Sequence, residues 1–121
     1  MSIIYLASPY TSDDVTVLND RAEKAAEAAA VLMSLGHIVF SPIVHGHPIA
    51  QACPGLIPLK DHAFWMKQCT YWLHHSDKLA VLKLEGWQES KGVRHEIEVA
   101  RDTGKEVIYI DHGNIAETIN V

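Results

Sequence analysis

The sequence predicts an α/β fold: a small three-layer domain of the Rossmann or flavodoxin type, with a mostly parallel four- to five-stranded sheet. Short, continuous apolar runs alternate with longer stretches of helical periodicity along the whole chain. This alternation is typical of βαβ units, whose strands pair in parallel and are buried on both faces. With 121 residues the chain fits a single domain, so residues 1–121 are expected to fold as one unit.

The expected strands are four apolar runs, at residues 2–7, 37–40, 78–84 and 106–110. After the first strand, Asp13 or Asp14 can cap a helix. Helical spacing covers four stretches: from that cap to Gly36, about residues 59–75, Ser90 to Gly104, and residues 114–119.

Residues 43–58, with several Pro and Gly, form the longest segment that the pattern predicts to be irregular. A loop of that length inside a small domain is usually functional or disordered. Its apolar and aromatic content argues against disorder, so we expect a functional loop.

Composition and charge exclude several classes of protein. The chain is 48% hydrophobic and 21% charged, as in ordinary globular proteins. Its formal net charge is −5 without a block of Lys or Arg, which argues against nucleic acid or an anionic membrane as partner. No apolar run approaches the roughly 20 residues of a membrane span, and residues 2–7 are too short for a signal peptide. Cys53 and Cys69 are too few for a disulfide scaffold, so a cytoplasmic location is expected.

Polar and aromatic side chains gather in the loops that follow the first three strands. They are Ser8 and Tyr10, then Ser41, His45 and His47, then Trp87, Ser90 and Gly92. The carboxyl ends of parallel strands lie at one edge of a sheet, and ligands bind there, near the point where the strand order reverses. The sequence therefore predicts a ligand pocket at this edge.

Glu96 has an unusual position in the helix that follows the third strand. At about 100° per residue it lies roughly 60° from Val93 and roughly 40° from Ala100, inside the apolar stripe. A buried carboxylate is costly unless it is paired or takes part in chemistry. Two interpretations stay open: a structural carboxylate, or a nucleophile or base that acts beside a sugar.

The start of the same helix also has two interpretations. Ser90, Lys91 and Gly92 form either an anion site, suited to a phosphate, or an ordinary Ser cap with a Gly turn. The chain contains neither a Walker motif nor a GxGxxG fingerprint, so no nucleotide cofactor is expected.

The eight histidines raise the question of a metal site. The pairs His45/His47 and His74/His75 match neither HExxH nor a Cys/His zinc spacing, so no metal is expected. His47 is instead a candidate for hydrogen bonding to a substrate.

The helical stretch over residues 59–75 is rich in aromatic residues: Phe64, Trp65, Tyr71 and Trp72. They are expected to pack in the core, and part of the set is dense enough for a subunit interface. Cys69 lies among them and is most simply a small buried hydrophobe.

Three motifs together carry a family resemblance. They are Ile4-Tyr5-Leu6-Ala7-Ser8-Pro9-Tyr10, Ser76-Asp77 before the third strand, and Ser90-x-Gly92-x-x-x-Glu96-x-x-x-Ala100 followed by Gly104-Lys105-Glu106-Val107. In combination they resemble the nucleoside 2-deoxyribosyltransferase-like superfamily. This group includes the deoxyribosyltransferases, the 2′-deoxynucleoside 5′-monophosphate N-glycosidases and small bacterial and phage relatives. The resemblance extends from the first strand to the fourth and is weakest over residues 43–58.

The resemblance implies roles for individual residues. The glutamate that matches Glu96 attacks the anomeric carbon and releases the base, and the tyrosine that matches Tyr5 orients that carboxylate. A glycosyl-enzyme forms and passes to water or to another base. At the position of Ser90, a Ser accompanies a 5′-phosphate and an Asp accompanies free nucleosides.

The resemblance thus implies Glu96 and Tyr5 as catalytic residues and no cofactor or metal. The expected substrate-binding residues are Ser8, Pro9, Tyr10, Ser41, His47, Trp87, Ser90 and Gly92. Of these, Ser8, Ser90 and Gly92 are expected at the sugar and phosphate, and Tyr10, His47 and Trp87 at the base. The implied partners are a deoxynucleoside monophosphate and further copies of the chain, in a homodimer or homotetramer.

One position departs from the family pattern. Many members carry an acidic residue at the position of Cys69, where it helps protonate the leaving base. Asp61 is two helical turns earlier, roughly 12 Å along the axis, and cannot simply substitute. Either another group such as Asp61 or a His protonates the base, or the base leaves easily, or activity is weak or lost.

The leading hypothesis is an N-glycosidase or base-exchange transferase that acts on a deoxynucleoside 5′-monophosphate. The alternative is a nucleotide-binding sensor on the same fold that does not turn over its ligand, which the Cys69 departure keeps open. A flavodoxin-like cofactor carrier is a remote third option, because no FMN phosphate loop is evident.

Overall fold

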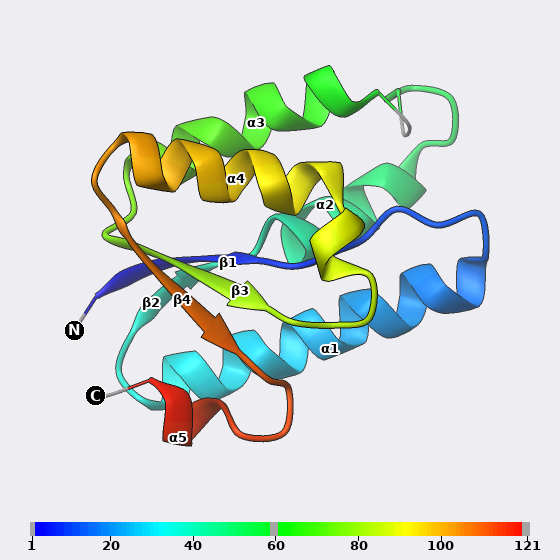
Figure 1. The fold of residues 1–121 in the computed structure, drawn as a ribbon. Coiled ribbons are helices and arrows are strands. Elements are labelled where there is room, and N and C mark those ends of the chain that lie inside the picture. The colour runs from blue at the N-terminus through cyan, green and yellow to red at the C-terminus, as the bar shows by residue number, and fades with distance from the viewer. Residues whose placement is uncertain (1, 59–60, 120–121) are drawn as a thin grey trace.

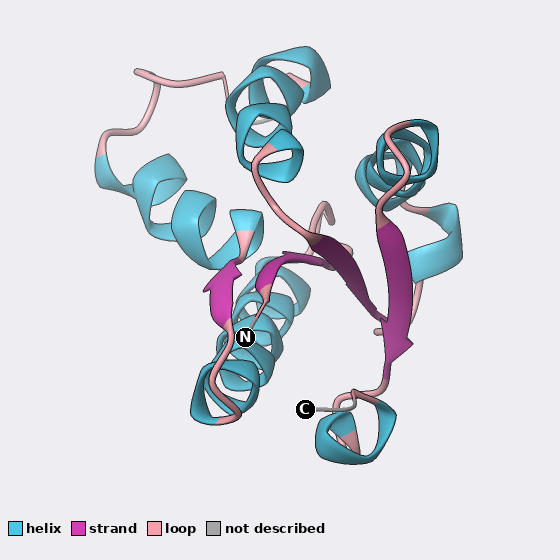
Figure 2. Ribbon diagram, turned by 90° about the vertical axis from the view of Figure 1, so that its left-hand side faces the viewer, coloured by secondary structure: helices cyan, strands magenta, loops and turns pink. Residues whose placement is uncertain are grey.

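The computed structural model describes residues 2–58 and 61–119 and shows a parallel sheet with helices on both faces (Figures 1 and 2). The strands are β1 (Ile3–Ala7), β2 (Ile38–Phe40), β3 (Lys78–Leu82) and β4 (Glu106–Ile110). The helices are α1 (Val15–Ser34), α2 (Pro42–Ala52), α3 (His62–His74), the short 3-10 turn η1 (Trp87–Glu89), α4 (Lys91–Asp102) and α5 (Ile115–Thr118). The predicted α/β class is confirmed.

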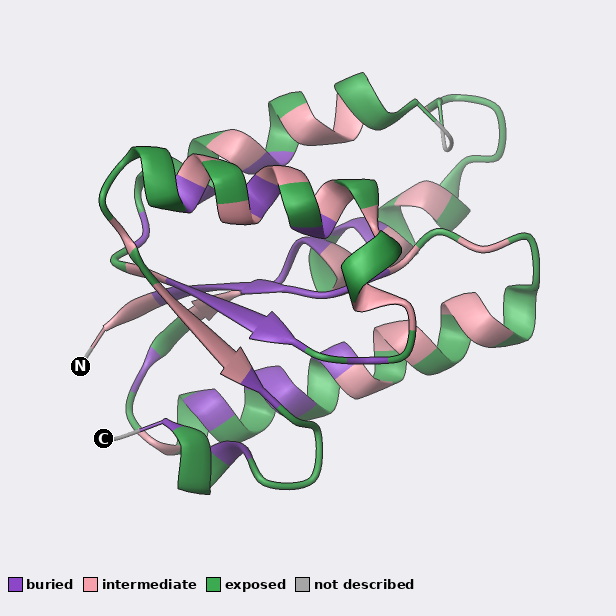
Figure 3. Ribbon diagram, viewed as in Figure 1, coloured by how far each residue is buried: buried purple, intermediate pink, exposed green. Residues whose placement is uncertain are grey.

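The strand order is β2-β1-β3-β4, and every pair is parallel. The chain leaves β1 toward one edge of the sheet and later returns to its other side with β3. The central strands β1 and β3 are buried, whereas the edge strands are partly exposed (Figure 3). The order therefore reverses between β1 and β3, where ligands bind in sheets of this kind.

Strand β1 contributes side chains to two separate cores, because successive side chains point to opposite faces of a sheet. Ile4 and Leu6 pack with buried residues of α1 and α5 on one face. Tyr5 and Ala7 pack with buried residues of α3 and α4 on the other. Figure 1 shows α1 and α5 below the sheet and α3 and α4 above it. Tyr5 therefore points toward the helix that carries Glu96.

The prediction of an irregular segment over residues 43–58 is wrong for its first part, which forms α2. The Ser41 Oγ accepts a hydrogen bond from the Val44 N–H at 3.2 Å, and Pro42 occupies the first helical position. Both residue types favour the start of a helix. Pro48 lies inside α2, so packing against α1 and β1 outweighs the hydrogen bond that its missing N–H cannot make.

Most other boundaries agree with the sequence-based expectation. Asp14 caps α1 by accepting from the Thr16 N–H at 2.8 Å, and Asp61 caps α3 by accepting from the Phe64 N–H at 3.2 Å. Residues 59 and 60, where the third helix was expected to begin, lie outside the described residues. Within the described ranges the sheet has four strands. No helix of those ranges combines the length and apolar character that crossing a membrane requires.

The Ser76-Asp77 motif holds the amino ends of the strands. The Asp77 Oδ2 accepts from the Ile3 N–H at 2.8 Å, and the Ile3 carbonyl accepts from the Asp77 N–H at 2.7 Å. The Lys105 Nζ donates to the Ser76 carbonyl at 2.7 Å. This motif therefore has a structural role at the edge opposite the predicted pocket.

Arg21 of α1 holds together two loops at the carboxyl ends of the strands. Its Nη1 donates to the Thr11 carbonyl and its Nη2 to the Glu85 carbonyl, both at 3.0 Å. Thr11 follows β1 and Glu85 follows β3. Gly86 has a φ of +88°, and a Cβ there would lie 3.1 Å from the Arg21 Nη2, so the close approach requires glycine. The guanidinium thus connects the two loops on either side of the switch point.

We expect the substitution Arg21→Met to lower the free energy of unfolding by about 1–2 kcal/mol, because two hydrogen bonds from a charged group are lost. Urea denaturation measures the change. Lys24→Met is the matched control, since Lys24 is partly exposed on the same helix and pairs with exposed Asp20 at 3.1 Å. Its effect should stay within about 0.5 kcal/mol. Equal losses in the two variants would contradict the connecting role of Arg21.

Candidate active site

Glu96 and Tyr5 form a buried pair between α4 and the sheet. Glu96 belongs to the buried stripe of α4 with Val93 and Ala100, and only 4% of it is exposed. The Tyr5 hydroxyl donates a hydrogen bond to the Glu96 Oε2. The position that helical spacing predicted for Glu96, and its contact with Tyr5, are both present in the structure.

The environment of the pair favours the protonated form of each group. Burial raises the pKa of the Glu96 carboxyl to about 8, although the hydrogen bond from Tyr5 lowers it in part. Burial and the adjacent Glu96 carboxylate raise the pKa of the Tyr5 hydroxyl far above its usual value. Tyr5 therefore remains a hydrogen-bond donor to Glu96 at any physiological pH.

Cys69 of α3 lies next to this pair. It is buried, and its pKa is raised to about 11, first by burial and then by the Glu96 carboxylate, while a hydrogen bond with Tyr5 lowers it in part. The thiol is thus neutral, and it packs in the same buried cluster as Tyr5. Cys69 was expected to be a small buried hydrophobe, and it does pack in the apolar core. It also lies close to two polar groups, the Tyr5 hydroxyl and the Glu96 carboxyl.

A hollow of about 170 Å³, the α2–α3 hollow, opens beside Cys69. It is lined by Phe40, Pro42, His45, Ile49, Ile57, Phe64, Trp65, Gln68 and Cys69. Cys69 lines this hollow and also packs in the buried cluster that contains Tyr5. Phe40 makes a second connection, because its ring centroid lies 5.7 Å from that of Tyr5 and 5.4 Å from that of His45.

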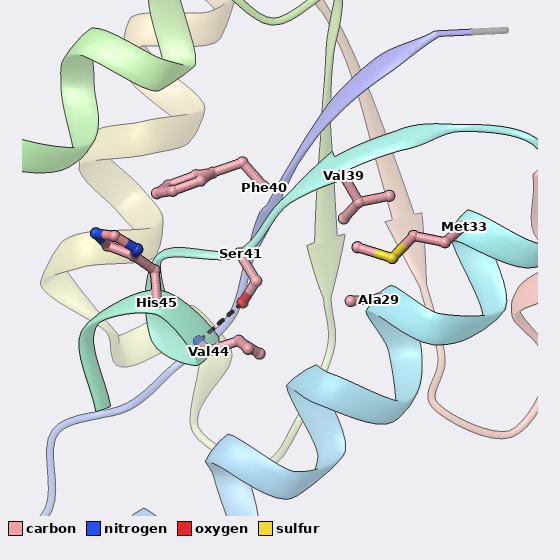
Figure 4. Close-up of a pocket in the computed structure, with 7 residues that line it drawn as sticks. All are labelled: Ala29, Met33, Val39, Phe40, Ser41, Val44 and His45. Atoms are coloured by element: carbon pink, nitrogen blue, oxygen red, sulfur yellow. Dashed lines mark hydrogen bonds between the residues drawn. The ribbon is translucent and has the colours of Figure 1, made fainter. Parts of the chain in front are cut away.

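A second hollow, of about 190 Å³, lies on the other side of Phe40 and His45, toward α1 (Figure 4). It is lined by Ala29, Met33, Val39, Phe40, Ser41, Val44 and His45. Ser41, a predicted substrate contact, uses its hydroxyl to cap α2. Apart from Ser41 and His45 the lining is apolar, and it includes no residue of the Tyr5–Glu96 pair.

The loop after β1 meets α2 through two of the predicted residues. The Tyr10 hydroxyl and the His47 Nδ1 are 2.5 Å apart, and their rings meet edge to face with centroids at 5.5 Å. Pro9 is fully buried. The Ser8 Oγ is buried and has no hydrogen-bond partner among the described residues. A buried hydroxyl of this kind is suited to a ligand group that completes its hydrogen bonds.

Ser90 and Gly92 lie at the amino end of α4, as predicted. The Ser90 Oγ accepts from the Val93 N–H at 3.2 Å, so Ser90 is the helix cap. A Cβ at Gly92 would be 3.9 Å from both the Met66 Cε and the Ser90 Oγ, an ordinary contact distance. The cap and an anion site are compatible, because the first N–H groups of a helix have no partner within it.

Trp87 does not lie with Tyr10 and His47. Its ring packs against Tyr109 of β4, with centroids 5.6 Å apart, and against the core between the sheet and α4. It lines neither hollow. Its place beside β4 comes from η1, which turns the chain before α4 begins.

The aromatic residues of α3 divide between two environments. Phe64 and Trp65 line the α2–α3 hollow, whereas Tyr71 and Trp72 are 59% and 45% exposed. The sequence pattern did not separate these pairs or single out the hollow. The one feature of the sequence that could have pointed to the hollow was Cys69, which stands at the family's acidic position.

The histidines show no shared metal site. His45 packs against Phe40, whereas His47 bonds to Tyr10. Over residues 2–58 and 61–119, no three His, Cys, Asp or Glu side chains form a cluster that could hold a metal ion.

The raised pKa of Glu96 predicts a pH dependence of stability. Between the ordinary value of 4.5 and about 8 the folded chain binds more protons than the unfolded chain, so the free energy of unfolding falls as pH rises. In the wild type we expect the free energy of unfolding to fall by a few kcal/mol between about pH 5 and about pH 9, as measured by urea denaturation. In Glu96→Gln, whose side chain stays neutral, this decrease should be absent. Glu98→Gln, on the exposed face of α4, should keep the wild-type slope. Parallel slopes for the wild type and Glu96→Gln would contradict the assignment.

Comparisons with known proteins agree with this fold. No curated protein matches the chain. Among solved structures, a similar one is a 2-deoxyribosyltransferase from the psychrotolerant bacterium Bacillus psychrosaccharolyticus, described as a biocatalyst for the synthesis of antiviral and antitumoral nucleosides. It is 24% identical with a TM-score of 0.61, over 98% of this chain and 77% of that chain. The predicted resemblance is thereby confirmed at the level of the fold. A family model described as a domain of unknown function, DUF1937, matches residues 2–112, and the chain belongs to that family.

Proposed function

We propose that the protein cleaves the N-glycosidic bond of a 2′-deoxynucleoside 5′-monophosphate and passes the deoxyribosyl group to water or to another base. The observation that carries this proposal is the buried Glu96 carboxyl with the Tyr5 hydroxyl bonded to it. Such a pair, on a fold shared with a 2-deoxyribosyltransferase, fits a nucleophile that reacts at the anomeric carbon of a sugar.

The reaction proceeds in two steps. A Glu96 carboxylate oxygen forms a bond to C1′, and the C1′–N bond breaks with its electron pair on the base. Water or a second base then attacks C1′ and frees the carboxylate. Tyr5 keeps the attacking oxygen in place by hydrogen bonding to the carboxylate. Because the pKa of Glu96 is about 8, the rate of the first step should rise as pH increases toward that value.

The phosphate and the sugar are assigned to the carboxyl ends of β1 and β3. The amino end of α4 at Ser90 and Gly92 suits a phosphate, because free N–H groups and the helix dipole favour an anion. The unpartnered Ser8 Oγ suits a sugar or phosphate oxygen. Tyr10 and His47, which bond to each other, would form the wall beside it, with Pro9 beneath.

The alternative is a nucleotide sensor that binds without turnover. Cys69 favours it, because the position of the family's acid holds a thiol with a pKa of about 11. The sensor and the enzyme share the same binding residues and differ only in whether base is released.

A panel of deoxynucleoside monophosphates separates the two functions. We expect the wild type to release free base, detected by chromatography, and Glu96→Gln to lose at least about 10³-fold of this activity, because the nucleophile is gone. Glu96→Ala is a second test of the same role. Binding without release in the wild type would favour the sensor, and undiminished release by Glu96→Ala would discard Glu96 as the nucleophile.

Ser90→Asp tests the phosphate site. Asp is as good a helix cap as Ser, so α4 should remain intact. Its carboxylate would repel a phosphate, and we expect KM for the monophosphate to rise by about tenfold or more while the free nucleoside is bound no worse. Ser90→Asn, a neutral cap, is the matched control. An equal KM in both variants would show that the phosphate binds elsewhere.

We also propose that the chain forms a homodimer or homotetramer through α3. Tyr71 and Trp72 are exposed there, with their rings edge to face and centroids 5.3 Å apart. Exposed aromatic pairs are enriched at subunit interfaces. Light scattering should give a mass above the 13.4 kDa of one chain, and Tyr71→Ser with Trp72→Ser should return it to that value.

A further inference from the structure

With the base in the α2–α3 hollow, where the resemblance places the family's acidic position, we propose that His45 protonates this base as the glycosidic bond breaks. This inference rests on the proposed function, because it concerns the same reaction at Glu96. In many family members an acidic residue at the position of Cys69 helps protonate the base. The inference assigns this role to His45 in a chain that has a cysteine there.

Two connections place the hollow beside the reacting carbon. Cys69 lines the hollow and packs in the same buried cluster as Tyr5, the hydrogen-bond partner of Glu96. Phe40 lines it as well and packs against the Tyr5 ring at 5.7 Å between centroids. A sugar attacked by Glu96 would therefore carry its base toward this hollow. The other hollow shares Phe40 and His45, but Cys69 is not among its described lining residues.

The size and lining of the hollow fit a base and little more. Its volume of about 170 Å³ lies below the roughly 300–1,000 Å³ of pockets that enclose a whole small ligand. Phe64 and Trp65 offer aromatic faces, on which a planar heterocycle stacks. His45 and Gln68 are the polar side chains that can bond to ring nitrogens and carbonyl groups.

His45 is the histidine among the described residues that line the α2–α3 hollow. The Cys69 thiol, with its raised pKa, holds its proton tightly. Asp61 caps α3 through the Phe64 N–H, and His47 is bonded to Tyr10. His45 lies in the first turn of α2 with its ring beside Phe40, and Figure 4 shows no bond from it to the other residues drawn. Among the described residues that line the two hollows, Cys69 is the other titratable group.

The proton balance of the step is as follows. The Glu96 carboxylate forms its bond to C1′, and the electron pair of the C1′–N bond moves onto the base. The imidazolium of His45 gives its proton to that base, and the imidazole recovers a proton from solvent. Histidine is the side chain that most readily exchanges a proton near neutral pH, and a positioned acid contributes about 10²–10⁴-fold to such a step.

The test compares two leaving groups in the wild type and in His45→Gln. The substrates are a deoxynucleoside monophosphate and 4-nitrophenyl 2-deoxyribose 5-phosphate, whose nitrophenolate leaves without protonation. We expect His45→Gln to lower kcat about 10²-fold or more for the nucleotide and to leave kcat for the nitrophenyl compound close to the wild-type value. His74→Gln, an exposed histidine that lines neither hollow, should match the wild type on both substrates.

The pH profile gives a readout that a purely structural role would not change. In the wild type kcat/KM for the nucleotide should fall on both sides of a maximum, whereas His45→Gln should keep only the ionisation of Glu96 and reach a plateau at high pH. Ile49→Trp, which fills the hollow, should raise KM for both substrates and leave the binding of 2-deoxyribose 5-phosphate unchanged.

The possible outcomes distinguish this inference from the function on which it rests. Full nucleotide cleavage by His45→Gln, or equal losses on both leaving groups, overturns the role of His45 while base release still depends on Glu96. An unchanged KM in Ile49→Trp overturns the base site. Absence of cleavage of either substrate by the wild type overturns the proposed function together with this inference.

Discussion

The hydrogen bond from Tyr5 to Glu96 is the interaction on which the candidate site depends. A carboxylate buried to this degree is costly unless a donor satisfies it, and the Tyr5 hydroxyl is that donor. The bond requires β1 to direct alternate side chains toward α4, and α4 to turn one face of its helix toward the sheet. The central strand and the helix that follows β3 are thus coupled through one polar contact inside an apolar core.

The two ends of the sheet serve different purposes. At the amino ends, Asp77 and Lys105 bond to backbone groups and align the strand starts. At the carboxyl ends, Arg21 joins the loops after β1 and β3. This division explains why one family motif, Ser76-Asp77, is structural, whereas the motif around Glu96 lies in the candidate site.

Neutral groups dominate the interior of the site. Glu96, Tyr5 and Cys69 all have raised pKa values, and burial is the first cause for each. With Glu96 as the proposed nucleophile, activity would fall at low pH, where the carboxyl is protonated, and the proton donor would come from a more hydrated position. The border of the α2–α3 hollow, where His45 is exposed, is such a position. In the proposed reaction the nucleophile would thus be buried and the proton donor exposed.

The sequence by itself determined the α/β class, the four strands, and the place of Glu96, because continuous apolar runs mark buried strands and helical spacing shows which side chains of a helix face a core. It left α2 unrecognised, since the Ser41-Pro42 pair is compatible with both a strand end and a helix start. Only the tertiary structure decided that Cys69 packs in one cluster with Tyr5 and that Trp87 packs on Tyr109. These contacts join segments far apart in the chain, and their geometry depends on how helices pack on the sheet, which no local pattern encodes.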